Sequence, residues 1–176
     1  MPQTRVLIAP NAFKHSLNAL DAAHAIQEGF RQSTLECVCT CFPIGVGGDG
    51  TGDLMIRKHN GQRISVEVDD PFGRRITASF GLVANGQTAI IEMASASGLH
   101  LVKPSELNPL KATSFGTGEL IKRALDEGVT QLVLAIGGSA TVDGGTGILR
   151  ALGIRFLDTS GNELTEPGTF TEIATI

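Results

Sequence analysis

Two glycine-rich segments, residues 45–51 and 137–145, constrain the fold of this chain more than any other feature. Each follows a short apolar stretch typical of a buried strand, and each precedes a segment with helical spacing of apolar residues. In open α/β sheets, ligands bind at the carboxyl ends of strands, where such loops lie. Glycine lets backbone N–H groups approach an anion, and a helix start adds free N–H donors and a favourable dipole. Both loops are therefore candidate phosphate sites in an α/β protein.

The first part of the chain predicts a β-α-β unit. Residues 5–9 and 35–42 have the composition of buried strands, and a helix with Ser16 as its N-cap is expected between them. Two strands joined through a helix form a parallel pair with a right-handed crossover. A further helix is expected over residues 51–59, directly after the first glycine-rich loop.

The residue pattern changes near residue 61, where segments rich in strand-forming residues begin. Asn85-Gly86 between two strand patterns is a strong hairpin signal, so an antiparallel second lobe is expected. We therefore predict two lobes, residues 1–61 and residues 62–176. The other expected elements are strands over residues 63–68, 75–83, 88–93, 131–136 and 154–157, and helices over residues 114–127 and 146–152.

Composition and charge limit the classes of partner. Hydrophobic residues make up 41% of the 176 residues, which is typical of a globular protein. The net charge is −4 and no run of Lys or Arg stands out, so no nucleic-acid partner is expected. No apolar run approaches the roughly 20 residues that a membrane helix needs, and no signal peptide opens the chain. We expect a cytoplasmic protein without membrane contact.

The cysteines Cys37, Cys39 and Cys41 follow one another at a spacing of two, which places them on one face of a strand. Such a group could bind a metal ion, but a structural zinc site requires a fourth ligand at a fixed loop spacing, and the sequence shows no residue at such a spacing. We expect free thiols in a reducing compartment.

Neither glycine-rich loop carries a known nucleotide fingerprint. The pattern G-x-x-x-x-G-K-[ST] does not occur, and residues 45–50 match G-x-G-x-x-G only in the second β-α turn rather than the first. A nicotinamide cofactor is therefore not favoured. The alternative interpretation is that the glycines only form tight turns.

Three charged residues accompany these loops. Lys14, between the first strand and its helix, can reach a phosphate or carboxylate as a point charge, or be an ordinary exposed lysine. Asp49 and Asp143 each lie inside a glycine-rich turn. Either can cap the helix that follows, bind magnesium, or accept a proton from a substrate hydroxyl.

Six further observations come from residues 8–17, 43–51, 91–99, 108–110, 116–121 and 137–145. Taken together and in chain order, these segments resemble the bacterial glycerate kinases of the first type. The resemblance implies transfer of a phosphoryl group from ATP, with Mg²⁺, to a hydroxyl of D-glycerate. It also implies a two-lobed fold, with a Rossmann-like first lobe, a mixed α/β second lobe and the active site between them. Because members of that family are longer, the chain is expected to be an N-terminal portion, incomplete at its C-terminus.

The resemblance also implies roles for single residues. Phosphoryl transfer is mostly positioning and charge neutralisation. Asp143 would orient the attacking hydroxyl or a magnesium ion, and Lys14 would neutralise a phosphate or the glycerate carboxylate. The residues implied to bind substrate or phosphate are Ser16, Gly47, Gly48, Asp49, Gly50, Thr51, Gly138, Ser139 and Thr141.

One departure from the family pattern stands in the first loop. Val46 occupies a position where the family carries an aspartate, and an isopropyl group can neither bind metal nor accept a proton. The alternatives are therefore an inactive kinase-like fragment or an α/β module that binds a small phosphorylated metabolite. Besides ATP and D-glycerate, the expected partners are the missing C-terminal half or another copy of the chain, because half a lobe leaves strand edges uncovered.

Overall fold

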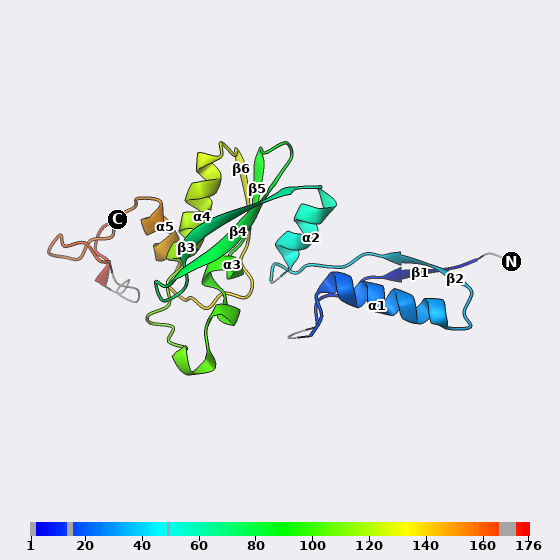
Figure 1. Cartoon of the computed structure of the whole chain (residues 1–176). Coiled ribbons are helices and arrows are strands. Elements are labelled where there is room, and N and C mark those ends of the chain that lie inside the picture. The colour runs from blue at the N-terminus through cyan, green and yellow to red at the C-terminus, as the bar shows by residue number, and fades with distance from the viewer. Residues whose placement is uncertain (1–2, 14–15, 49, 166–171) are drawn as a thin grey trace.

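The structure, a computed structural model, describes residues 3–13, 16–48, 50–165 and 172–176. The chain is a mixed α/β protein with a two-stranded sheet, β1-β2, and a four-stranded sheet, β3-β4-β5-β6 (Figure 1). The α/β class predicted from the sequence is confirmed. None of the helices in the described ranges is long and apolar enough to cross a membrane.

The first unit consists of β1 (Thr4–Ile8), α1 (Ala19–Gln32) and β2 (Cys37–Cys41). The two strands pair in parallel, as predicted. The predicted N-cap Ser16 is wrong, because Asn18 caps α1: its Oδ1 accepts the Asp21 N–H at 2.8 Å. Ser16 instead donates its backbone N–H to Phe13 O at 3.0 Å in the turn before the helix.

The second sheet contains β3 (Gln62–Asp69), β4 (Arg75–Val83), β5 (Thr88–Glu92) and β6 (Gln131–Ala135). The first three pair antiparallel, as expected, whereas β6 pairs in parallel with β5. The hairpin predicted at Asn85-Gly86 joins β4 and β5, and both residues have positive φ, 55° and 82°. Such a backbone is the one that favours Asn-Gly in tight hairpins.

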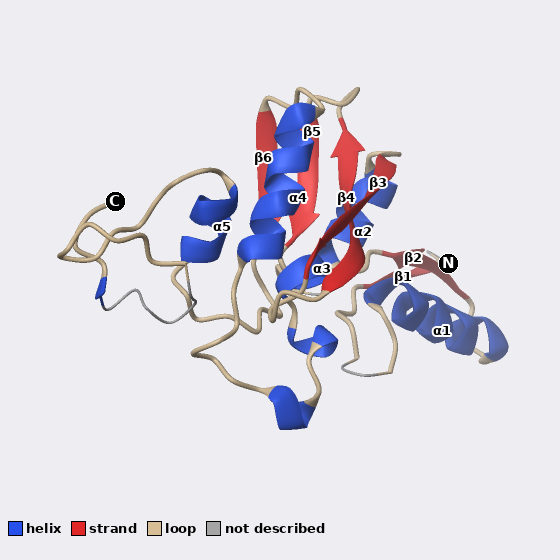
Figure 2. Ribbon diagram, turned by 60° about the vertical axis from the view of Figure 1, so that its left-hand side comes forward, coloured by secondary structure: helices blue, strands red, loops and turns tan. Residues whose placement is uncertain are grey.

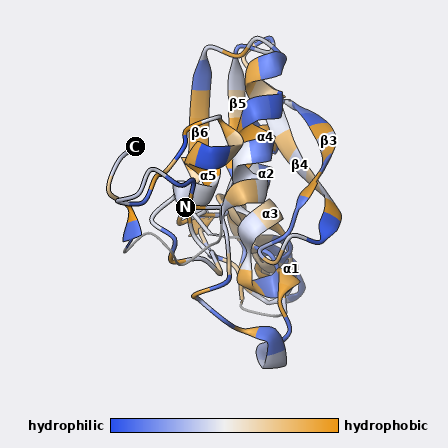
Figure 3. Cartoon of the chain, turned by 90° about the vertical axis from the view of Figure 1, so that its left-hand side faces the viewer, coloured by the Kyte–Doolittle hydropathy of each residue, from blue (hydrophilic) through white to orange (hydrophobic). Residues whose placement is uncertain are grey.

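Helices cover both faces of this sheet (Figure 2). On one face α4 (Phe115–Asp126) packs through Leu120 against Ile91 and its neighbours in the larger core. On the other face α2 (Thr51–Lys58) packs through Ile56 against Ile90. Ile90 and Ile91 are adjacent in β5 and point to opposite faces, which explains why the middle of the strand is apolar on both sides. Figure 3 shows polar and apolar stretches alternating along α4, typical of an amphipathic helix.

The remaining elements are short: α3 (Ala94–Ser97), the 3₁₀ turns η1 (Leu99–Leu101) and η2 (Pro104–Glu106), and α5 (Thr146–Ala151). The strand predicted over residues 154–157 is wrong. Only Leu157 forms isolated bridges, to Glu163 and Thr175, because no strand of either sheet pairs with this segment in the described ranges. The division into lobes at residue 61 stays a prediction.

Candidate functional site

The two glycine-rich loops, 90 residues apart in the sequence, touch each other. The Gly137 N–H donates to Gly47 O at 2.5 Å. A Cβ on Gly137 would lie 2.5 Å from both Gly47 O and the Gly48 Cα, so a side chain at this position would push the loops apart. The loops that the sequence indicated separately therefore form one site.

A third segment, residues 93–99, contacts the second loop at the carboxyl ends of β5 and β6. Leu99 N–H donates to Gly138 O at 2.9 Å, and Ala140 N–H donates to Ser97 O at 2.8 Å. The segment lies directly after β5, and the loop of residues 137–145 lies directly after β6. The parallel pairing of these strands is what brings the two segments to the same edge of the sheet.

The first loop is held by contacts that begin α2. Thr51 Oγ1 accepts the Gly47 N–H at 3.0 Å, and Gly50 adopts φ 86° at the N-cap. Glu92, at the end of β5, accepts the Gly52 N–H at 2.8 Å through Oε1 and so ties the helix start to the sheet. Glu92 was not among the predicted residues. A carboxylate that ends a buried strand at the ligand edge was the signal that could have found it.

The predicted residues Lys14 and Asp49 lie outside the described residues. Ser16 is exposed in the turn before α1.

Hydroxyl groups order the second loop. Ser139 Oγ and Thr141 Oγ1 are 2.9 Å apart, and Ser139 Oγ also accepts the Thr141 N–H at 3.1 Å. Gly138 has a φ of 75°, which a residue with a side chain rarely adopts. Both hydroxyls are half-buried, so they stay within reach of a ligand at the loop surface.

Asp143 is 2% exposed and is surrounded by donors. Its Oδ2 accepts the Ser114 N–H and hydroxyl, both at 2.8 Å, and the Gly147 N–H at 3.2 Å, while Oδ1 accepts the Gly145 N–H at 3.1 Å. Ser114 Oγ in turn accepts the Ile148 N–H at 3.1 Å. This Asp143–Ser114 network fastens the second loop to the starts of α4 and α5. Of the roles that the sequence left open for Asp143, these contacts favour capping.

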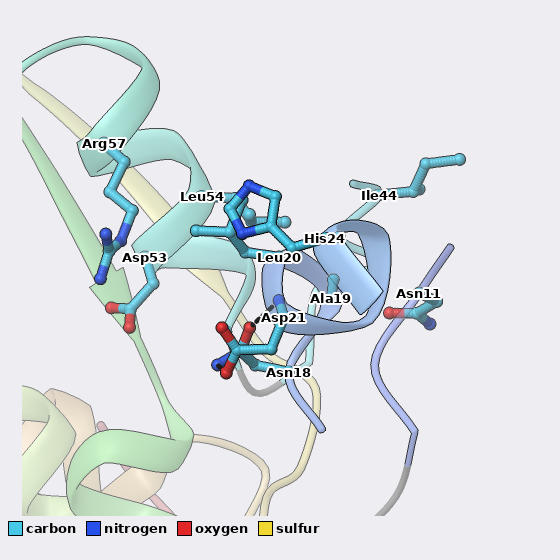
Figure 4. Close-up of a pocket in the computed structure, with 12 residues that line it drawn as sticks. Asn11, Asn18, Ala19, Leu20, Asp21, His24, Ile44, Asp53, Leu54 and Arg57 are labelled. Atoms are coloured by element: carbon cyan, nitrogen blue, oxygen red, sulfur yellow. Dashed lines mark hydrogen bonds between the residues drawn. The ribbon is translucent and has the colours of Figure 1, made fainter. Parts of the chain in front are cut away.

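A cleft of about 190 Å³ lies between α1 and α2, beside the first loop (Figure 4). Arg57 and Asp53 come from α2, and Asp21 and His24 face them from α1. Asp53 accepts a hydrogen bond from Arg63, whereas Arg57 forms no ion pair with any residue in the described ranges. Gly45 and Gly50 also line this cleft, so a ligand there would contact the first loop.

The cysteine side chains lie away from this site, on β2. The Sγ atoms of Cys37 and Cys39 are 3.7 Å apart, and Cys41 donates to Ala23 O at 3.6 Å. Burial raises the pKa of the Cys39 thiol, and its hydrogen bond with Cys37 adds to this. Within the described ranges, no group of three or more His, Cys, Asp or Glu side chains could hold a metal ion.

The fold and the loops define a class. This is an α/β protein with two glycine-rich loops joined at the carboxyl edge of a parallel strand pair, the arrangement typical of proteins that bind phosphorylated ligands.

The chain belongs to the glycerate kinase family, whose sequence profile matches residues 6–176. It is 48% identical to "Glycerate kinase" of Bacillus subtilis, over 93% of this chain and 43% of that protein. It is 51% identical to "Glycerate kinase" of Haemophilus influenzae, over 88% of this chain and 41% of that protein. The crystal structure of putative glycerate kinase 2 from Salmonella typhimurium LT2 matches with a TM-score of 0.79 and 43% identity, over 99% of this chain and 47% of that one. The chain thus spans less than half the length of these relatives.

Proposed function

We propose that this chain is part of an enzyme that phosphorylates D-glycerate with ATP. The observation that carries the proposal is the direct contact between the two glycine-rich loops in a chain that belongs to the glycerate kinase family. In the reaction, a glycerate hydroxyl oxygen bonds to the γ-phosphorus, the bond to the ADP oxygen breaks, and the hydroxyl proton leaves. The products are a phosphoglycerate, ADP and a proton.

Positioning is the main task of the residues in such a reaction. We place the phosphates along the joined loops, where backbone N–H groups and the hydroxyls of Ser139 and Thr141 can donate to them. We place D-glycerate in the cleft between α1 and α2, where the Arg57 guanidinium can form an ion pair with its carboxylate. Lys14, proposed as a second cation, lies outside the described residues. Asp143 acts in this scheme by holding the second loop in shape.

Magnesium supplies charge neutralisation on the phosphates in ATP-dependent kinases. The described residues do not fit a resident ion: both Asp143 oxygens accept hydrogen bonds from the chain, and no group of three possible ligands occurs in the described ranges. We also propose the cytoplasm as the compartment, since three free thiols suit a reducing environment.

The test is a coupled assay of ADP release with D-glycerate as acceptor and glycerol as control. We expect ADP release that depends on D-glycerate, from the chain alone or from the chain joined to the C-terminal half of a relative such as the Bacillus subtilis protein. If neither form releases ADP above the glycerol background, the proposed function is wrong.

A kinase-like protein that binds ligands without turnover is the second candidate, and Val46 favours it. The side chain is 72% exposed in the first loop, where an isopropyl group offers no acceptor for a proton or a cation. Restoring an acid with Val46→Asp would then create or raise ADP release. Equal rates for both forms would remove the reason for this alternative.

A further inference from the structure

A second cavity, of about 420 Å³, lies where the turn of residues 70–73 meets the start of α4 and the end of α5. Its volume falls in the range of pockets that hold small-molecule ligands and cofactors. The walls come from segments far apart in the sequence, and the Thr113 N–H donates to Pro71 O at 2.9 Å where they meet. This pocket is distinct from the cleft between α1 and α2, since none of the residues that the structure describes lines both.

Two phenylalanines line the pocket, each beside a guanidinium group. Arg74 lies over the Phe72 ring, 5.9 Å from its centroid, and Arg150 lies over the Phe115 ring at 5.8 Å. Both rings are half-buried, so part of each stays accessible from the pocket. Aromatic rings and guanidinium planes are the surfaces on which flat nucleic bases stack.

The pocket carries positive charge that the described residues leave uncompensated. Among the described residues that line it, Asp69 is the one carboxylate, and it forms an ion pair with Arg75 at 3.0 Å. Lys111 and Arg150 have no carboxylate partner in the described ranges. An arginine and a lysine together suit phosphate groups. A ligand that fits both the aromatic rings and the positive charges of the pocket has a flat base and phosphates.

The pocket also adjoins the second glycine-rich loop. Thr113 and Phe115 flank Ser114, which binds Asp143 of that loop. On the other side, a Cβ on Gly147 would lie 2.5 Å from Thr113 Oγ1, so α5 packs tightly against this wall. We propose that the pocket binds the nucleotide that donates the phosphoryl group, with its base against the phenylalanine rings and its phosphates running from Lys111 and Arg150 toward the loop of residues 137–145. The proposal rests on the proposed function and assigns the nucleotide and the acid to opposite ends of the joined loops.

Calorimetric titration of the chain with MgATP, adenosine and inorganic tripolyphosphate tests the assignment. Phe115→Ala should weaken adenosine and MgATP about tenfold, the effect of losing one base-stacking surface, and leave tripolyphosphate unchanged. Arg150→Ala should weaken MgATP and tripolyphosphate. The matched control is Phe42→Ala, an exposed phenylalanine outside the pocket that also lies under a cation, Lys58, at 5.7 Å. Thermal melts of each variant establish that it is folded.

A Phe115→Ala chain that is folded and binds MgATP within twofold of the parent overturns the assignment, and so does an equal loss in Phe42→Ala. If Phe115→Ala melts early, Phe72→Ala gives the same test on the second ring. An unaltered chain that binds no MgATP also overturns it. ADP release in the coupled assay separates failure of the pocket from failure of the proposed function. If the parent chain releases ADP in a glycerate-dependent way, but Phe115→Ala and Phe72→Ala bind MgATP as tightly as the parent, only the nucleotide pocket is wrong.

Discussion

The Asp143–Ser114 network predicts a large loss of stability on replacing Asp143 with alanine. The substitution removes a buried acceptor and leaves the Ser114, Gly145 and Gly147 N–H groups without it. Each buried donor left without a partner costs about 1–3 kcal/mol. Because the Gly145 bond is closer to solvent and the terms overlap, we expect a total of about 3–5 kcal/mol. That is a large part of the roughly 5–15 kcal/mol that keeps a typical domain folded.

Urea unfolding followed by circular dichroism measures this loss. Ser114→Ala should cost about 1–2 kcal/mol, since it removes one donor to Asp143 and the acceptor of the Ile148 N–H but leaves the backbone bond in place. The double variant should cost less than the sum of the two, because both remove the same hydroxyl–carboxylate bond.

Asp158→Ala is the matched control. Asp158 also accepts from neighbouring donors, the Ser160 and Asn162 N–H groups at 2.8 Å and the Asn162 side chain at 3.0 Å, but it lies in a solvent-accessible turn. Water can replace the lost partner there, so the stability should change little. If Asp143→Ala lowers the free energy of unfolding no more than Asp158→Ala does, burial is not what makes the network strong and the reasoning fails.

Three further predictions concern other parts of the chain. Asn18→Ala should lower the free energy of unfolding by about 1 kcal/mol, as measured by urea titration, because it removes the N-cap of α1. Gly137→Ala should weaken MgATP binding at least tenfold by calorimetry, since its Cβ would separate the joined loops; unchanged affinity would show that their contact is not needed. The Lys103 N–H, and then Arg74, lower the pKa of Glu106 below its usual 4.5. Its contribution to stability should therefore be present above that value and be lost as the pH falls through the lowered pKa, and Glu106→Gln should remove this dependence from acid unfolding curves.

Local pattern was enough to predict most elements of the fold. Helices and strands of this chain follow apolar periodicity, and the Asn85-Gly86 turn follows from the backbone geometry that a tight hairpin needs. The two wrong predictions, the N-cap of α1 and the strand over residues 154–157, concern features that the local residue pattern alone does not decide. Ser16 and Asn18 are both good N-caps by residue type, and α1 begins after Asn18 rather than after Ser16. Residues 154–157 have strand composition, but without a partner strand in the described ranges they form only isolated bridges.

In the candidate site, too, local features could be predicted from the sequence and long-range contacts could not. The glycine-rich loops could be found from sequence because glycine clusters between strand and helix are a local signal. Their contact could not, because it depends on β6 pairing with β5 rather than with another strand. Glu92 and Ser114 were missed for a related reason: the groups they bind, Gly52 and Asp143, lie 40 and 29 residues away in the sequence.

The way Asp143 is held bears on how the site could work. A loop that must present backbone N–H groups to a phosphate gains most when its shape is fixed before the ligand arrives, because reorganisation during the reaction then costs little. A buried carboxylate with four donors fixes the second loop to α4 and α5 at once, and the Gly137 contact passes that constraint to the first loop. An aspartate engaged in this way is poorly placed to take a proton from the proposed glycerate substrate as well. In the proposed reaction, Asp143 would therefore hold the loops in shape, and other groups would contact the substrate.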